Sequence, residues 1–449
     1  MSSADIGQDG TAFDRFEAQV KELKRGAPPV NLSDDERVRI AKRTMLEKLD
    51  FGTAMDLETC VHCGMCAEAC HFYEATQDPK YTPIHKAYLL RKVYRRELSP
   101  IRFLNKLFLR EITAQQLEDW QELVFNSCTE CGRCDMMCPM GIHISKAIAI
   151  TREALGAAGL APPELRAVEH EQSESGTLFG IGPPELEATI AQLRSRGLQI
   201  PIDKPKADVM VLTTAIDLVL YKESFAATAK VLNKLGVDWT LEHSGFEAAN
   251  FGLVSGHHSG QALESKRVVD AAIACGAKIV ITPECGHAYP ALRWESANEL
   301  QKRLPFEVMA ISEYMGREIV AGRLKVRPMA KQKKVTYQDP CKIARQGGVF
   351  AEPRAVLAAL GLELREMESH GKTQYCCGGG AGVFLIDAAE PLRRRTFEIK
   401  QHQVDDTGAD SLVTTCNTCR LSFTSNARKV NWNTPIESLV ELVAANLAD

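Results

Sequence analysis

Eight of the chain's fifteen cysteines stand in two short runs with the same spacing. Three thiolates at steps of three residues can wrap one face of a small cubane cluster, and the fourth cysteine of such a run binds the neighbouring cluster in two-cluster ferredoxins. The repeated spacing therefore predicts two cubane [4Fe–4S] clusters. The expected ligand sets are Cys60, Cys63, Cys66 with Cys138, and Cys128, Cys131, Cys134 with Cys70.

Zinc sites and disulfides are the alternatives for these two runs. Zinc sites usually take cysteines in pairs, not four at steps of three, three and four. Fifteen cysteines in a chain whose start, MSSADIGQDG, lacks the features of a signal peptide favour a reducing compartment. In such a compartment thiols bind metal more often than they form disulfides.

A third group of cysteines lies in the C-terminal part of the chain, and it contains the adjacent pair Cys376 and Cys377. Adjacent cysteines do not both face a cubane comfortably, but they can bind an opened cluster in which one thiolate bridges two irons. The glycines 378–380 that follow would let the backbone close on such a cluster without a Cβ clash. The alternative is that the pair is simply buried, as free cysteines often are. The full group is Cys341, Cys376, Cys377, Cys416 and Cys419.

The spacing of this group, with Cys-Cys-Gly at 376–378 and Cys-x2-Cys at 416–419, resembles the cysteine-rich "CCG" domain of heterodisulfide reductases. The order of motifs over residues 55–445 resembles their fused catalytic subunit. It also resembles the catalytic iron–sulfur subunit of the membrane complex associated with dissimilatory sulfite reductase. The resemblance implies that the five cysteines hold a non-cubane [4Fe–4S] cluster at which a disulfide is cleaved or formed.

The preceding stretch of chain departs from the CCG pattern. Asn250-Phe251-Gly252 stands where the pair would be, and Glu284 and His287 replace the last two cysteines, so one non-cubane cluster is expected. Cys285 survives between them. We predict that it is a redox-active thiol or an extra ligand, with His287 as proton donor. The alternative is a structural remnant beside a locally bonded histidine.

Several other residues could assist or compete for such roles. The cationic or proton-donating candidates for a leaving thiolate, besides His287, are Lys342, Arg345, His370 and Lys372. His257 and His258 could reach a substrate but are more typical of a solvated loop. Cys275, at an apparent helix end, is expected in the core.

The pattern of strands and helices expected to position these residues predicts a multidomain chain. An α-helical ferredoxin module with two clusters is followed by two related α/β halves of CCG type. Strands are expected at 209–213, 279–282, 335–338 and 412–415, and helices at 222–235, 261–275, 352–360 and 388–407. The expected divisions are a helical extension (1–45), the ferredoxin module (46–155), a linker with one helix (156–205), a degenerate CCG-like half (206–330) and the CCG domain (331–449).

Composition narrows the function classes. A net charge of −4 with 25% charged residues gives no bias toward nucleic acid, and no apolar run reaches the ~20 residues of a membrane span. We expect a cytoplasmic protein, which a partner could hold on the inner face of a membrane. The basic and apolar segment 86–110 would lie on a membrane or partner, or else form the inner face of the helical spacer.

These observations predict an iron–sulfur oxidoreductase subunit that reduces or oxidises a disulfide or persulfide, with the two cubanes relaying electrons. No flavin or nucleotide motif is visible, so electrons must pass through another redox subunit: a flavoprotein, a ferredoxin-like protein or a membrane quinone or cytochrome subunit. The sulfur substrate could be free or on a carrier protein. The alternative is an electron-transfer subunit of a flavin-dependent glycolate or lactate dehydrogenase, or of an electron-transfer-flavoprotein-linked quinone-reducing complex.

Overall fold

The computed structural model describes residues 10–448. The prediction that no signal peptide begins the chain rests largely on residues 1–9, which lie outside the described part. The first described helix, α1 (Gly10–Glu22), packs against residues that lie about 400 positions later in the chain. Glu17 accepts a hydrogen bond from Ser425 at 2.6 Å, and Asp14 pairs with Arg428 at 2.6 Å. The N-terminal extension is thus anchored to the C-terminal half.

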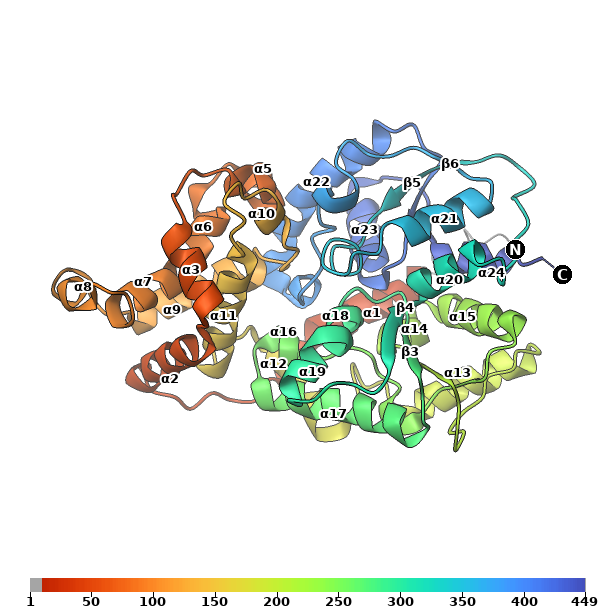
Figure 1. The fold of residues 1–449 in the computed structure, drawn as a ribbon, viewed down its shortest axis with the longest axis horizontal. Helices are drawn as coiled ribbons and strands as arrows, with labels where there is room; N and C mark the ends of the chain where they lie inside the picture. The colour runs from red at the N-terminus through yellow and green to blue at the C-terminus, as the bar shows by residue number, and fades with distance from the viewer. Residues whose placement is uncertain (1–9, 449) are drawn as a thin grey trace.

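The helical region that follows forms the arm at the left of Figure 1. Its helix α2 (Asp34–Lys48) begins at a capping box in which Ser33 and Glu36 satisfy each other's backbone N–H groups. Buried side chains such as Met45, Leu90 and Phe125 form its core. The helical spacer expected between the cysteine runs is confirmed. The remaining helices are α3 (Phe51–Thr59), α4 (Cys66–Ala69), α5 (His71–Thr76), α6 (Pro83–Lys86), α7 (Tyr88–Glu97), α8 (Arg102–Phe108), α9 (Ala114–Gln121), α10 (Arg133–Met136) and α11 (Ile144–Ala157).

Two four-stranded parallel sheets follow, and their strand orders are equivalent: β2-β1-β3-β4 and β6-β5-β7-β8. The four predicted strands are confirmed as the central pair of each sheet. The edge strands were not predicted, and two of them, β2 and β6, have only two residues each, too few to show an apolar pattern. The first sheet comprises β1 (Val209–Val211), β2 (Trp239–Thr240), β3 (Ile279–Thr282) and β4 (Glu307–Ala310). The second comprises β5 (Lys334–Gln338), β6 (Glu363–Leu364), β7 (Ser411–Thr414) and β8 (Ile436–Ser438).

Helices cover both sheets, and the two α/β halves share one hydrophobic core. That core joins Val211 and Met315 of the first half to Tyr337, Val413 and Leu442 of the second. Burial across the joint holds the carboxyl ends of both sheets in a fixed relation. The principal helices are α14 (Ala215–Val219), α15 (Lys222–Leu235), α17 (His258–Ala274), α20 (Ile311–Val320), α21 (Ala351–Ala359), α22 (Glu390–Asp405), α23 (Asn417–Val430) and α24 (Leu439–Ala445).

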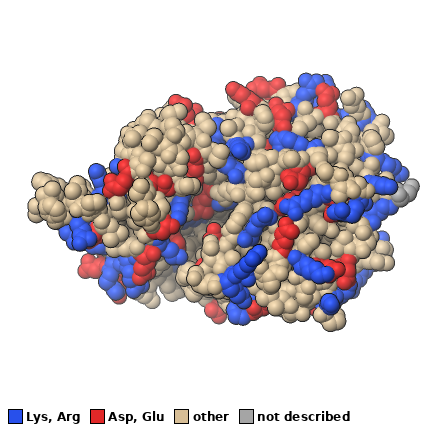
Figure 2. Space-filling model, in the orientation of Figure 1, with Lys and Arg blue, Asp and Glu red and all other residues tan. Residues whose placement is uncertain are grey.

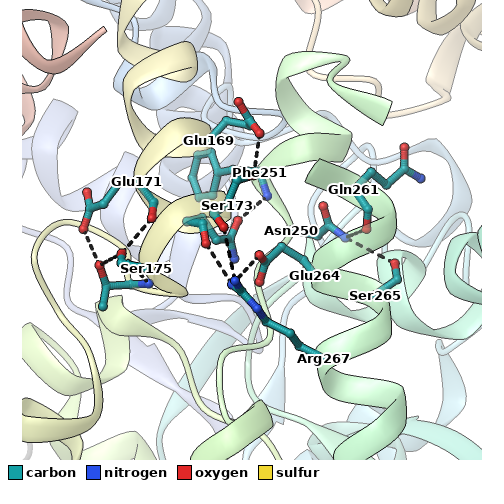
Figure 3. A network of polar contacts seen from close by, with 12 residues as sticks. Glu169, Glu171, Ser173, Ser175, Asn250, Phe251, Gln261, Glu264, Ser265 and Arg267 are labelled. Atoms are coloured by element: carbon teal, nitrogen blue, oxygen red, sulfur yellow. Dashed lines mark hydrogen bonds and ion pairs between the residues drawn. The ribbon is translucent and has the colours of Figure 1, made fainter. Parts of the chain in front are cut away.

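The segment 156–205 holds two helices where the sequence predicts one: α12 (Pro163–Ser175) and α13 (Pro183–Ser195). The composition is misleading because α12 buries polar side chains. Figure 3 shows Arg267 of α17, which pairs with Glu264 of the same helix at 2.6 Å and donates to the Ser173 carbonyl of α12 at 3.2 Å. Arg267 also donates to the Gln172 carbonyl at 2.8 Å. The Gln172 side chain in turn accepts from the N–H of Phe251 at 2.9 Å. Helix α12 therefore braces the loop that replaces the Cys-Cys pair in the first half.

Across residues 10–448, no helix combines the length and the apolar character needed to span a membrane.

Candidate functional site

The first cysteine run folds into a tight loop between α3 and α4. His62 and Gly64 both adopt left-handed backbone conformations there, with φ of 54° and 83°, which turns the loop around its thiols. One small cavity, of about 20 Å³, is lined by all three thiols of the loop together with the last cysteine of the second run, an arrangement that matches the predicted exchange of fourth ligands. These thiols are Cys60, Cys63, Cys66 and Cys138. Cys63 is exposed, so this set opens to the surface.

The second run lies deeper. Burial, Asp135 and the neighbouring thiols raise the pKa of Cys134 well above its ordinary value, and those thiols are Cys131, Cys128 and Cys70. The buried ammonium of Lys86 lies 3.7 Å from the sulfur of Cys70. The structure thus brings Cys70 to the second set, as the spacing predicts, while the ligand role of each cysteine stays a prediction.

The third set gathers at the carboxyl ends of β5 and β7, the edge where open parallel sheets bind ligands. Cys341 follows β5, and Cys416 follows β7 and precedes α23. The thiols form a chain of contacts: Cys376 touches Cys341 and Cys377, and Cys419 touches Cys377 and Cys416. All five are buried.

Glycines fit closely around this third set. A Cβ on Gly379 would lie 2.8 Å from the Cβ of Ser422, and one on Gly286 would lie 3.1 Å from the sulfur of Cys416. The N–H of Gly286 already points at that sulfur, at 3.3 Å. Only backbone can therefore approach the thiols here, which is the surrounding expected for a compact inorganic group.

A cavity of about 100 Å³ lies between the two α/β halves, directly over the third set. Its lining is mostly apolar, with Phe251 and Val254 from the first half and Phe384 and Leu385 from the second. Its thiols come from both halves: Cys285, Cys341, Cys377, Cys416 and Cys419. A small sulfur compound entering this cavity would meet sulfur, hydrocarbon and few polar groups.

Cys285 and His287 both line the cavity. Burial raises the pKa of the Cys285 thiol, whose sulfur accepts from the N–H of Ala288 at 3.5 Å. Burial also lowers the pKa of His287 to about 4, so the ring is neutral at pH 7. Its Nε2 is held at the backbone of Asn250, 2.8 Å from the carbonyl oxygen. The catalytic roles of both residues stay predictions.

The other candidate residues from the sequence analysis differ in whether they line the cavity. Lys342 lines the cavity, 3.9 Å from Glu130. The remaining candidates turn away: Arg345 donates to main-chain carbonyls, and His370 bonds its nearby Met367 carbonyl. His257 pairs with Glu169 at 2.5 Å and His258 with Glu299 at 3.1 Å, and neither lines the cavity. Lys372 is exposed, and Cys275 is buried in the core, as predicted.

The second and third thiol sets meet directly. The thiol of Cys131 contacts that of Cys376. Arg345 donates to the Cys131 carbonyl at 2.7 Å, while Arg133 donates to the Thr373 carbonyl at 2.7 Å and lies 3.7 Å above the ring of Tyr375. These bonds hold the helical region against the C-terminal half where the second and third thiol sets meet.

Arg152 joins three parts of the chain beneath the cavity. Its guanidinium, 2% exposed, donates to main-chain carbonyls of the helical region, of the first α/β half and of the second. These carbonyls belong to Val124, Cys128, Val254 and Ala381. A planar fork of five donors suits such convergence better than an ammonium would.

Comparison with known proteins agrees with this geometry. Residues 56–142 match the 4Fe-4S dicluster domain family, and residues 335–424 match the cysteine-rich domain family. The Hdr-like menaquinol oxidoreductase iron-sulfur subunit 2 of Archaeoglobus fulgidus is 27% identical over 88% of this chain and 80% of its own length. One subunit of the dihydromethanophenazine:CoB–CoM heterodisulfide reductase of Methanosarcina barkeri is 29% identical over 91% of this chain and 99% of its own length.

The chain is a homologue of heterodisulfide reductase-like iron–sulfur subunits. The predicted resemblance is therefore confirmed. The EtfAB:quinone oxidoreductase of Syntrophomonas wolfei is also similar, at 27% identity over 81% of this chain and 53% of that protein. The names of these relatives describe oxidoreductases, and an iron–sulfur oxidoreductase subunit in electron transfer is the coarse function that the comparisons support.

The structure adds residues to this heterodisulfide reductase-like site that the sequence pattern did not predict. His71, 2% exposed, has no partner for either ring nitrogen within residues 10–448, and its surroundings include Cys131 and Cys377. Lys400 is buried on α22, where Cys376 and Cys377 act on its charge. A signal existed for Lys400, because it occupies a core position in the stripe of Arg393, Phe397, Lys400 and Val404.

Glu247, a buried carboxyl in the cavity wall, gives a test by pH. Burial raises its pKa from 4.5 to about 8, although it accepts N–H groups from Ala249 and Ala215. The folded state therefore binds more protons than the unfolded state between these values, and stability should fall as pH rises from 4.5 to 8. Glu247→Gln should flatten that fall, by on the order of a few kcal/mol.

Denaturant unfolding of the intact protein at several pH values would measure this effect. Glu398→Gln, at an exposed position of α22, is the matched control and should leave the slope unchanged. An unaltered slope in the Glu247 variant would show that Glu247 is ionised in the folded protein.

Proposed function

We propose that the chain is an oxidoreductase subunit that reduces or oxidises a disulfide- or persulfide-type sulfur compound in the cavity between its α/β halves. The first half is a CCG-type unit that has lost its ligands, and the second half retains them. The observation that carries the proposal is the apolar cavity walled by thiols of both halves, in contact with the second cysteine set through Cys131 and Cys376.

The residues fit three iron–sulfur clusters. Each set offers four or five thiols. The third set is enclosed by glycines at positions where a Cβ would collide with neighbouring atoms. The ring nitrogens of buried His71 have no other partner in the described chain. No three His, Cys, Asp or Glu side chains within residues 10–448 are arranged for a single metal ion. The five thiols of the third set would hold the non-cubane cluster, which would supply iron able to bind a substrate sulfur and would accept or donate single electrons.

The chain's own residues shape the rest of the reaction. Reducing a disulfide takes two electrons and two protons and yields two thiols, so a redox partner must supply the electrons. The apolar walls, including Phe251 and Leu385, exclude water from the cleaved bond. Lys342 is the cation that reaches the cavity, and it would stabilise a leaving thiolate. Cys285, beside the third set, would exchange with a substrate disulfide: its sulfur would bond to one substrate sulfur as the S–S bond breaks, and its thiol proton would pass to the released sulfur.

Electrons would enter or leave at the first cysteine set, at the end of the helical region away from the cavity. Cys63 of the first set is exposed, whereas every cysteine of the third set is buried. The order first set, second set, third set therefore runs from the surface to the cavity. A partner needs to contact only the surface around Cys63 to exchange electrons with the whole chain.

Iron content and paramagnetic spectra test this proposal. Protein reconstituted without oxygen should hold about twelve irons per chain, from three four-iron clusters. Mild oxidation in the presence of small thiols should produce a new paramagnetic signal that depends on the thiol. About eight irons and no thiol-dependent signal would falsify the third cluster and the sulfur chemistry together.

One alternative is favoured by the similarity to EtfAB:quinone oxidoreductase. The chain would then be an electron-transfer subunit, linked to a flavin-dependent 2-hydroxy acid dehydrogenase or to an electron-transfer flavoprotein, and would pass electrons toward quinone. This alternative predicts that a flavoprotein reduces the clusters and that their paramagnetic signal does not respond to thiols.

A further inference from the structure

The end of the helical arm exposes apolar side chains that no part of the described chain covers. We call residues 98–110 the α8 tip. Phe103 is 67% exposed, Leu107 77% and Phe108 81%, and α8 has no buried residue. Leu98, Ile101 and Leu104 are exposed as well. Figure 1 shows α8 at the outermost end of the arm, beyond α7 and α9.

Polar bonds hold the α8 tip in place. Asn105 donates to the Arg95 carbonyl at 2.8 Å, and Arg96 donates to the carbonyls of Lys106 and Leu109 at 3.2 and 2.6 Å. The tip is therefore fixed against α7 by its backbone, and its apolar side chains point outward. This is the reverse of the usual arrangement, in which a helix packs by its apolar face.

Cations surround these apolar side chains. Arg95, Arg102, Lys106 and Arg110 are exposed, while Glu97 is the one acidic residue between 91 and 110. Glu97 is already bonded to Lys42 at 2.8 Å and to Lys106 at 3.3 Å. Within residues 10–448, Arg102 and Arg110 have no acidic partner. Figure 2 shows that the end of the arm is uncharged and that lysine and arginine, interspersed with acidic residues, lie beside it.

We propose that the α8 tip docks onto an anionic phospholipid bilayer. The exposed phenylalanine and leucine side chains would enter the boundary between headgroups and acyl chains, and the arginines would reach lipid phosphates. Charge complementarity favours this occupant. A protein partner would need about 800 Å² of matching surface, whereas α8 is a convex helix only about 10 Å long.

The proposed docking does not depend on the sulfur chemistry, but it would fix the orientation of the protein at the membrane. Helix α7 connects the tip to the first cysteine set, because Arg91 contacts the ring of His62 at 3.4 Å. Docking would therefore place the exposed set near the membrane surface. The cavity lies in the other part of the molecule, between the two α/β halves.

Co-sedimentation of the full-length, cluster-loaded protein with vesicles tests the proposal. The protein should bind vesicles of mixed phosphatidylcholine and phosphatidylglycerol more tightly than vesicles of phosphatidylcholine alone, and added salt should weaken that binding. The double variant Leu107→Ser/Phe108→Ser should bind at least about tenfold more weakly. Val320→Ser, at a position 76% exposed at the end of α20, is the matched control and should bind as the natural protein does.

A second variant separates charge from apolar insertion. Arg102→Gln/Arg110→Gln should lose the preference for phosphatidylglycerol while its iron content stays unchanged. Equal vesicle binding by the natural protein and the Leu107/Phe108 variant would overturn the proposal. Failure of the natural protein to bind either vesicle would also overturn it, and would assign the tip to a protein partner.

Discussion

Replacement of Cys377 with serine is expected to remove about a third of the protein's iron and to abolish the thiol-dependent paramagnetic signal. Cys377 is central in the third set, because its thiol contacts both Cys376 and Cys419. A serine hydroxyl is a poor replacement for a thiolate at iron, and the closely packed glycines leave no room for another ligand. Iron assay and spectra of the reconstituted variant would measure both effects.

Two further cysteine variants make this result specific. Cys275→Ser, at a buried core position outside the three sets, should retain full iron and the signal. Cys285→Ser should retain the iron but lose turnover of a disulfide substrate, if Cys285 exchanges with substrate rather than binding iron. Full iron in the Cys377 variant would contradict the assignment of the third cluster.

Replacement of Arg152 with alanine is expected to lower the free energy of unfolding by about 3–5 kcal/mol, the usual cost of breaking a buried charged network. The variant would leave buried carbonyls of Val124, Val254 and Ala381 without a donor, and each such loss is costly. Arg152→Lys should recover only part of this, because an ammonium cannot span three segments. Thermal unfolding followed by circular dichroism would measure the loss.

The same variant should loosen the joint between the second and third thiol sets. Rapid-freeze spectra after reduction of the first set should show slower electron arrival at the third in Arg152→Ala. Arg43→Ala, on the exposed face of α2 with a side chain 63% accessible, is the control for both measurements. Stability equal to that of the natural protein would show that water replaces the guanidinium at these carbonyls.

Much of the molecule could be predicted from local signals. The capping box at Ser33, the helices between the cysteine runs and the central strands β1, β3, β5 and β7 all follow from short-range patterns. The placement of Cys138 with the first run and of Cys70 with the second could also be predicted, because the fourth cysteine of such a run serves the other cluster in two-cluster ferredoxins. Edge strands such as β2 and β6, two residues each, carry no such pattern.

The sequence by itself predicted which thiols would bind metal, and it determined how they are grouped, because spacing along a loop decides which sulfurs can lie together. Only the tertiary structure decided what surrounds them. Arg152, His71 and Lys400 come from distant helices, and burial, which no local pattern encodes, gives each its role. The cavity itself exists because two sheets with equivalent strand order share one hydrophobic core and bring Cys285 opposite Cys416.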